Sequence, residues 1–422
     1  MKRSMSVCLG EDAVEVGILA FEAKGSRRSA SFVYADSWLV NPDRFALSPD
    51  LPLVTGYQFR ANKDSNQSAF FGCFADVEPD GWGRMVIRRD YARQRKESAK
   101  HRKESDGEQL AVGLLNDFDF LLWVNDFSRM GAIRFRDDTG VFHRPSGGKR
   151  EPPTLIQLPH LLSASKAVEE NKETARDLEY LRGNGTSLGG LRPKCSIIDT
   201  DGSLAIGKFP SVKDTRSIVH GEVLALHLAA AAGIDAAKAR VVDSEGVPVA
   251  VISRFDRLNG KRLMYLSARS LMQATSAEQF TYVDIADTLR MYSSQAAADL
   301  KELWRRMVFN ILINNVDDHL NNHGFLHHAH GQWKLAPAFD LNPFPDKERA
   351  LKTWISEEAG EAASLAEALA VAHLFGLSHG TKSAVLDEVK SAVVNWKSIA
   401  RAIGMSAVDI NSFAPAFEHP EL

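Results

Sequence analysis

Apolar and polar residues alternate along the first part of the chain in the manner of β-strands. The alternation runs from residue 6 to about residue 36 and is clearest at 14–21 and 31–34. Because successive side chains of a strand point to opposite faces, a period of two predicts strands with one buried face. Farther along, the stretch 79–83 is typical of a strong turn, and a helix is predicted after it.

The helix after this turn has a basic face. Its arginines and lysines recur from Arg84 to Lys103 and are interspersed with Glu97 and Glu104. A charge run of this kind is typical of a solvated helix and linker, and the intervening glutamates favour that interpretation. A patch for nucleic acid or for a protein partner is the alternative.

The middle of the chain mixes the two periodicities. The pattern predicts an apolar helix at 114–122, a strand at 131–135 and a charged amphipathic helix at 164–181. A second group of elements follows: strands at 195–198 and 204–209, an apolar helix at 223–232 closed by Gly233, and a hairpin of strands at 239–242 and 249–253.

A buried helix leads into a polar loop in the last third of the chain. Apolar residues at helical spacing predict the helix at 303–312, and the Asn-rich and Asp-rich loop 315–322 follows it. Two short strands, 323–328 and 332–335, then precede Asp340. The predicted order is therefore helix, polar loop, hairpin and carboxylate.

Composition narrows the class of protein. A chain of 422 residues is too long for one compact core and should divide into two or three units. A net charge of -3 gives no general attraction to nucleic acid or to an anionic membrane. Three cysteines favour a reducing cytosol over a disulfide framework. Because no stretch has the pattern of a signal peptide or membrane helix, we expect a soluble cytoplasmic protein.

The polar loop and the carboxylate after the hairpin suggest phosphoryl transfer. Magnesium prefers hard oxygen ligands and takes one or two carboxylates, with phosphate and water completing its shell. Asp317 and Asn322 have the spacing of a protein-kinase catalytic loop, and Asp340 takes the place of the metal-binding aspartate after it. The alternative is an ordinary polar loop, because Asn and Asp favour turns.

A glycine-rich stretch provides a second candidate site. Glycines at 183–194 let backbone N–H groups turn toward an anion, although the pattern is neither of the standard phosphate-loop motifs. A strand carrying Lys208 follows, and Glu222 opens the next helix. A glycine-rich hairpin followed by a strand lysine is how a kinase N-lobe covers ATP. We therefore predict a Lys208–Glu222 pair, although a glutamate in a first turn stabilises any helix.

These motifs together resemble the HipA family of bacterial serine/threonine kinases, the toxins of HipBA-type toxin–antitoxin modules. The resemblance is carried by the phosphate-loop stretch 187–194, the hinge motif 254–257, the catalytic loop 315–322, the metal-binding segment 335–340 and the N-terminal stretch 74–82. It implies an α+β fold with a bilobal protein-kinase-like core, a β-rich N-lobe and a helical C-lobe, after an N-terminal α/β subdomain. The implied boundaries are 1–109, 110–255 and 256–422.

The resemblance also implies roles for individual residues. Asp317 would be the catalytic base, with His319 supporting its loop, and Asn322 and Asp340 would hold Mg²⁺ beside ATP. Ser187 would be a regulatory serine whose autophosphorylation expels the loop. Together with Asn322 and Asp340, the residues implied at the nucleotide are Ser187, Gly189, Gly190, Lys194, Lys208, Glu222, Ser253, Phe255 and Asp256.

The implied partners are a HipB-like helix-turn-helix antitoxin, operator DNA through that antitoxin, and a bacterial protein substrate; aminoacyl-tRNA synthetases are among the family's targets. Two positions complicate the resemblance. Ser253 stands where the family often has Glu before the hinge, and Thr186 neighbours the regulatory serine. Two other functions stay open: a catalytically silent kinase-fold binding subunit or co-repressor, and a small-molecule kinase on the same scaffold.

Overall fold

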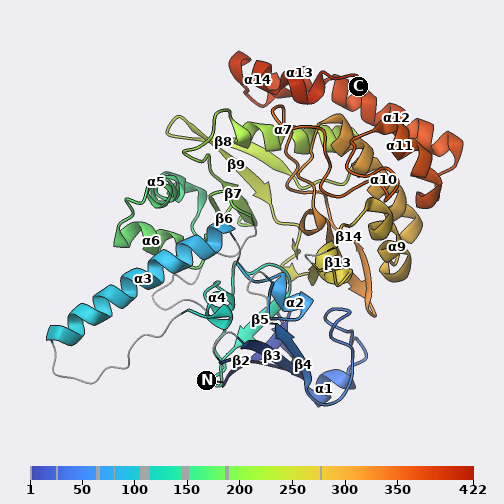
Figure 1. The fold of residues 1–422 in the computed structure, drawn as a ribbon. Coiled ribbons are helices and arrows are strands. Elements are labelled where there is room, and N and C mark those ends of the chain that lie inside the picture. The colour runs from blue at the N-terminus through green and yellow to red at the C-terminus, as the bar shows by residue number, and fades with distance from the viewer. Residues whose placement is uncertain are drawn as a thin grey trace.

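The computed structural model describes residues 2–24, 27–62, 67–79, 81–104, 115–143, 152–185, 190–275 and 278–422. Its mixed α/β fold has a β-sheet at the N-terminal end, a second sheet in the middle, and helices toward the C-terminus (Figure 1). Within the described ranges, no helix combines the length and apolar character needed to cross a membrane. The three cysteines are buried and unpaired, so the prediction of no disulfide framework is confirmed.

The N-terminal sheet is antiparallel, with strand order β4-β3-β2-β1-β5. Its strands are β1 (Lys2–Leu9), β2 (Val14–Lys24), β3 (Arg27–Tyr34), β4 (Gln58–Asn62) and β5 (Ile133–Arg136). The predicted alternation is confirmed in β2 and β3, whose buried side chains include Phe21 and Phe32. Short helices α1 (Asp36–Leu39), α2 (Gly72–Ala75) and α4 (Asp117–Leu122) accompany the sheet.

The first sheet extends past the boundary expected from the sequence. β5 pairs with β1, bringing Phe135 opposite Val7, and α4 stacks Phe118 on Phe21 with ring centroids 5.9 Å apart. A boundary at 109/110 separates both elements from the sheet that they complete. We therefore propose that the N-terminal unit continues to about residue 143.

The second sheet has helices on both faces. Its strands β6 (Lys194–Ile198), β7 (Leu204–Lys208), β8 (Ala239–Ser244) and β9 (Val247–Ser253) lie in the order β6-β7-β9-β8. Alternate residues of β9 face opposite layers, because Val249 and Val251 join one apolar cluster while Ala250 and Ile252 join another. Helices α3 (Gly81–Glu104), α5 (Leu158–Glu169) and α6 (Ala175–Leu181) cover the first of these faces.

The prediction of a single helix at 164–181 is wrong, because the chain forms two helices there. Asn171 has a φ of 59°, a left-handed conformation that interrupts the first helix. Thr174 then caps the second, since its side chain accepts from the Asp177 N–H. The basic helix α3 extends away from the body (Figure 1) but is partly neutralised, for example by the Arg89–Glu173 ion pair of 2.8 Å.

Helix α7 (Ile218–Ala231) covers the other face of the second sheet and is itself covered by C-terminal helices (Figure 1). Most of the α7 surface is apolar, because the helix is buried on two sides. A Cβ on Gly221 would lie 2.6 Å from the Phe413 ring, so the two helices approach closely at that point. Gly233, with a φ of 73°, ends the segment as predicted.

The rest of the chain is mainly helical. Its helices are α8 (Ala268–Leu271), α9 (Tyr282–Tyr292), α10 (Ala296–Leu312), α11 (Leu365–Ala370), α12 (His379–Val394), α13 (Trp396–Ala402) and α14 (Ala407–Phe417), with 3-10 turns η1 (Leu155–Gln157), η2 (Leu320–Asn322) and η3 (Val371–Phe375). Its strands are β10 (Arg257–Leu258), β11 (Lys261–Arg262), β12 (Tyr265–Ser267), β13 (Gly324–Ala329) and β14 (Gln332–Leu335). The predicted helix, polar loop and hairpin are confirmed as α10, 315–322 and β13–β14.

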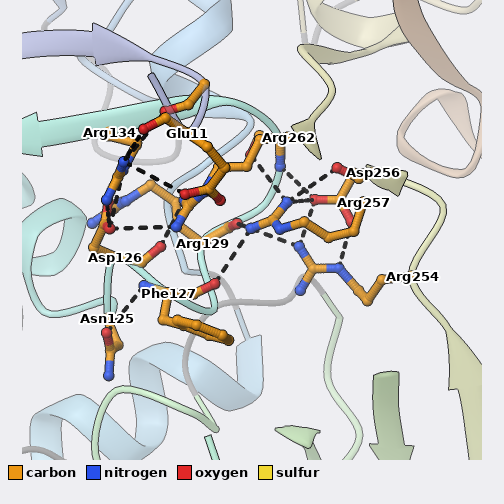
Figure 2. A network of polar contacts seen from close by, with 12 residues as sticks. Glu11, Asn125, Asp126, Phe127, Arg129, Arg134, Arg254, Asp256, Arg257 and Arg262 are labelled. Carbon is orange, nitrogen blue, oxygen red and sulfur yellow. Dashed lines mark hydrogen bonds and ion pairs between the residues drawn. The ribbon is translucent and has the colours of Figure 1, made fainter. Parts of the chain in front are cut away.

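A buried arginine–carboxylate network joins the N-terminal unit to the end of β9 (Figure 2). Asp256 is fully buried and accepts from Arg254 at 2.6 Å, from Arg257 at 2.7 Å and from the Gly131 N–H at 2.7 Å. Burial alone would raise the pKa of Asp256, but the two guanidinium groups hold it well below its usual value. The Arg254–Arg257 segment is therefore fixed to the loop that precedes β5.

We expect Asp256→Asn to lower the free energy of unfolding by about 3 kcal/mol, because two arginines lose their buried counter-charge. Urea denaturation followed by tryptophan fluorescence at pH 7 measures this, with Asp387→Asn, at an exposed position of α12, as control. The lowered pKa makes the wild-type contribution present above the usual aspartate pKa of about 3.9 and lost as the pH falls below it. An equal loss of unfolding free energy in Asp256→Asn and Asp387→Asn would contradict a stabilising role for the buried Asp256 network.

Candidate active site

A cleft of about 740 Å³ lies between the second sheet, the polar loop and the N-terminal unit. Its wall beside the second sheet is made by Gly190, Lys194, Ile206, Lys208, Glu222, Ala237, Ile252, Ser253, Phe255, His319, Asn322, Phe339 and Asp340. Charged groups and apolar side chains therefore share one cavity. Such a lining suits a ligand with an anionic part and a flat apolar part.

Lys208 is the central charge of the cleft. Its ammonium lies 2.5 Å from Glu222 Oε1 and 2.7 Å from Asp340 Oδ1. The predicted Lys208–Glu222 pair is thus confirmed as a contact, and the same ammonium also reaches the predicted metal-binding carboxylate. Burial would lower the pKa of Lys208, but the two carboxylates outweigh it and raise that pKa above its usual value.

Asp340 is held in an uncommon backbone conformation. Its φ is 57°, in the left-handed region that aspartate tolerates better than most residues. The preceding Ala338 exchanges backbone hydrogen bonds with the loop after α7, accepting from the Ala237 N–H at 2.9 Å. Burial would raise the pKa of Asp340, but Lys208 and Lys194 hold it below its usual value, so the carboxylate is ionised.

The polar loop places Asn322 in the lining of the cleft, whereas Asp317 is not among the described residues that line it. The Asn322 side-chain amide donates to the Asp317 carbonyl at 3.5 Å, which turns its Oδ1 away from that carbonyl. The Asp317 carboxylate is half-exposed and forms an ion pair with Lys352, while Lys347 lies 3.9 Å from its other oxygen. Asp317 is thus partly open and lies beside two lysines.

The neighbouring Asp318 has a different environment. It is buried, it accepts from the Tyr282 hydroxyl and from Asn310 at 3.0 Å, and His323 Nε2 lies 2.9 Å from it. Burial would raise the pKa of Asp318, but His323 and the Tyr282 hydroxyl lower it. Asp318 therefore supports the loop from below, which leaves Asp317 as the carboxylate that faces solvent.

His319 and Lys194 complete the polar wall of the cleft. His319 lines the cleft, and its Nδ1 is buried with no hydrogen-bond partner in the described part of the chain. Lys194 is the first residue of β6 and pairs in register with Lys208. Both strands therefore present a lysine at the same end of the sheet.

The hinge residues divide between the cleft and the core. The Ser253 N–H already donates to the Lys238 carbonyl at 2.9 Å, so adenine recognition would rest on the Ser253 carbonyl and on Phe255. The Phe255 ring packs against Phe339 at a centroid distance of 5.3 Å. The Asp256 carboxylate accepts from protein donors in the buried junction, and its role at a nucleotide stays a prediction.

Two predicted residues of the phosphate loop, Ser187 and Gly189, lie outside the described residues, as does Thr186. Gly190 is described, has a φ of 97° and lines the cleft. The roles assigned to Ser187 and Gly189, and the effect of Thr186 beside them, stay predictions.

The sequence analysis missed Lys352 and Lys347. They follow Asp340 in a segment without a motif, and no pattern places them at Asp317. Backbone hydrogen bonds decide their position, because Lys352 donates to the Val316 carbonyl at 3.1 Å and Thr353 to the Asp318 carbonyl at 3.1 Å. The segment thereby lies along the polar loop.

Asn322 and Asp340 are the residues that could hold a magnesium ion. Among the described residues, no group of three or more His, Cys, Asp or Glu side chains is arranged for a metal. One carboxylate and one amide oxygen are nevertheless the ligand set that Mg²⁺ uses when phosphate oxygens and water supply the remainder. The residues present therefore fit a metal that arrives with a polyphosphate.

The fold and cleft define a mixed α/β protein with a lysine–carboxylate site beside a polar loop. Family models match two parts of the chain, the HipA N-terminal domain at residues 5–112 and the HipA-like C-terminal domain at 186–397. The chain belongs to the HipA family.

Individual relatives are more distant. "Putative kinase Y4mE" of Sinorhizobium fredii is 27% identical over 188 residues, covering 37% of this chain and 41% of the relative. A "Putative kinase" of Haemophilus influenzae is 25% identical over 187 residues, covering 38% and 54%. The matched regions thus span about half the length of these curated relatives.

A solved structure from Shewanella oneidensis MR-1, of a toxin–antitoxin system with HipA, HipB and operator DNA, has a similar fold. The TM-score is 0.66 at 16% identity, covering 98% of this chain and 95% of that one.

We expect the two adjacent aspartates to differ in their effect on stability. Asp318→Ala should lower the free energy of unfolding by about 3 kcal/mol, because it leaves buried donors unpaired. Asp317→Ala should change it by about 0.5 kcal/mol or less, since its partners are exposed lysines. Thermal and urea unfolding of both variants measures the difference, and a larger loss for Asp317→Ala would reverse our assignment of the two roles.

Proposed function

We propose that the protein is an ATP·Mg-dependent serine/threonine protein kinase and the toxin of a type II toxin–antitoxin module. The observation that carries this proposal is the Lys208 ammonium within 2.7 Å of both Glu222 and Asp340. A strand lysine paired with a helix glutamate is what a kinase uses to hold ATP phosphates. HipA family membership and relatives named as kinases support the same function.

In this proposal the two regions are the lobes of a kinase. The second sheet with α7 forms the N-lobe, and the helical region from about residue 256 forms the C-lobe. The apolar lining Ile206, Ala237, Ile252, Phe255 and Phe339 would receive adenine. The nucleotide then lies with its phosphates toward Lys208.

Each charged residue has a defined task in the transfer. Lys208 binds the phosphates and keeps its place through Glu222. Asp340 and Asn322 would hold the metal, which would supply charge neutralisation at the phosphates. Asp317 orients the acceptor hydroxyl and takes its proton, using the carboxylate oxygen that Lys352 does not occupy. Catalysis is then mainly positioning and charge neutralisation.

The proposed partners and regulation rest on the family. The Shewanella structure contains HipA together with HipB and operator DNA. We propose that this chain likewise binds a HipB-like antitoxin, reaches operator DNA through it, and acts in the cytoplasm on a bacterial protein, with aminoacyl-tRNA synthetases as the first class to test. Autophosphorylation at Ser187 would silence the kinase, because a phosphate adds about two negative charges beside the pocket.

The test is intact mass after incubation with ATP and Mg²⁺, on protein treated beforehand with phosphatase. Wild type should gain one phosphate, Ser187→Ala none, and Asp317→Ala should react at least about 100-fold more slowly. Asp387→Ala on α12 is the control that should match wild type.

Equal rates for Asp317→Ala and wild type would refute the catalytic assignment. Binding of ATP without transfer to the protein or to any added protein would instead favour a silent co-repressor. Transfer to small molecules alone would favour a small-molecule kinase.

A further inference from the structure

The first turn of α3 touches the end of the glycine-rich stretch. The backbone N–H of Trp82 donates to the Gly190 carbonyl at 3.0 Å, and the Trp82 indole donates to the Lys194 carbonyl at 3.1 Å. One residue of the N-terminal unit therefore forms hydrogen bonds with both ends of the segment 190–194. Neither bond was expected from the sequence, in which the partners lie over a hundred positions apart.

The contact leaves no room for larger groups. A Cβ on Gly81 would lie 2.5 Å from the Gly190 carbonyl oxygen, and one on Gly190 would lie 2.5 Å from the Lys194 ammonium. Both glycines also have positive φ values, 29° and 97°, which side chains disfavour. Glycine at position 81 is thus what allows α3 and the segment 190–194 to approach, whereas glycine at position 190 leaves space for the Lys194 ammonium.

Trp82 is anchored deeply enough to hold its partners in place. Its side chain is fully buried in the cluster that covers the second sheet, together with Leu161, Ile197 and Phe209. Phe209, directly after β7, also donates its N–H to the Pro193 carbonyl at 3.0 Å. The segment is therefore held by α3 and by the strand that carries Lys208.

The position of the segment 190–194 determines where the Lys194 side chain lies in the cleft. Lys194 is buried at the start of β6, opposite Lys208, and like Asp340 it lines the cleft. A shift of the Lys194 backbone would move its ammonium relative to both. Gly190 would move with it, since the two are joined through Trp82.

We propose that Trp82 is a positioning residue for the nucleotide site, through which α3 sets the affinity for ATP. The inference rests on the proposed ATP site and adds that the N-terminal unit takes part in it. The side chain touches no substrate and acts by fixing Gly190 and Lys194 where the phosphates bind.

The experiment compares Trp82→Phe with Val86→Ala in the full chain. Val86 lies one turn farther along α3, is buried in the same cluster and makes no hydrogen bond to the segment through its side chain. Loss of the indole donor should raise the Kd and KM for ATP·Mg about three- to ten-fold, with kcat changed less than about two-fold. Val86→Ala should lower the melting temperature but leave the Kd within about two-fold of wild type.

A second readout needs no nucleotide. In the free protein, amide hydrogen exchange of a peptide spanning 190–196 should quicken in Trp82→Phe and stay unchanged in Val86→Ala. Gly81→Ala, which pushes on the Gly190 carbonyl without altering the core, should act in the same direction on exchange and on Kd.

The outcomes separate the two proposals. If wild type binds no ATP, the proposed function fails, and exchange alone then decides whether Trp82 holds the segment. If wild type binds ATP but Trp82→Phe changes Kd and exchange no more than Val86→Ala does, Trp82 is only a core residue and the inference is overturned.

Discussion

The ammonium of Lys208 bridges two carboxylates that come from different parts of the chain. Glu222 is buried in α7 and Asp340 follows the β13–β14 hairpin, 14 and 132 residues from the lysine. Burial raises the pKa of Glu222 above its usual value and the Lys208 ammonium opposes that rise, so the buried carboxylate depends on the lysine as its counter-charge. The same contact ties strand, helix and hairpin together around one charge, and the cleft is arranged about it.

The other polar groups extend this arrangement outward. Asp318 supports the polar loop from the buried side, and Asp256 fixes the end of β9 to the N-terminal unit. Trp82 makes a second connection from that unit, to the segment that carries Lys194. The N-terminal unit is therefore part of the framework of the cleft, which is why its contacts bear on nucleotide binding.

The sequence contained the local structure and the main charges of the site. Alternation predicted β2 and β3, helical spacing predicted α10, and motif order predicted the Lys208–Glu222 contact. Long-range pairing was not predictable: β5 joins β1 across more than a hundred residues, and Lys352 reaches Asp317 through backbone bonds that leave no motif. The prediction of one helix at 164–181 was wrong because the helical spacing of apolar residues continues across Asn171. The left-handed backbone of Asn171 breaks the helix at that point.

The most direct test of the central claim is calorimetric titration of ATP·Mg into wild type and Lys208→Met. If the ammonium is the phosphate-binding charge of the cleft, wild type binds ATP·Mg and the variant binds at least about ten-fold more weakly, as expected for a lost charge-assisted contact. Circular dichroism would verify that the variant is folded. Equal affinities in the two folded proteins would contradict the claim that nucleotide phosphates are held at Lys208.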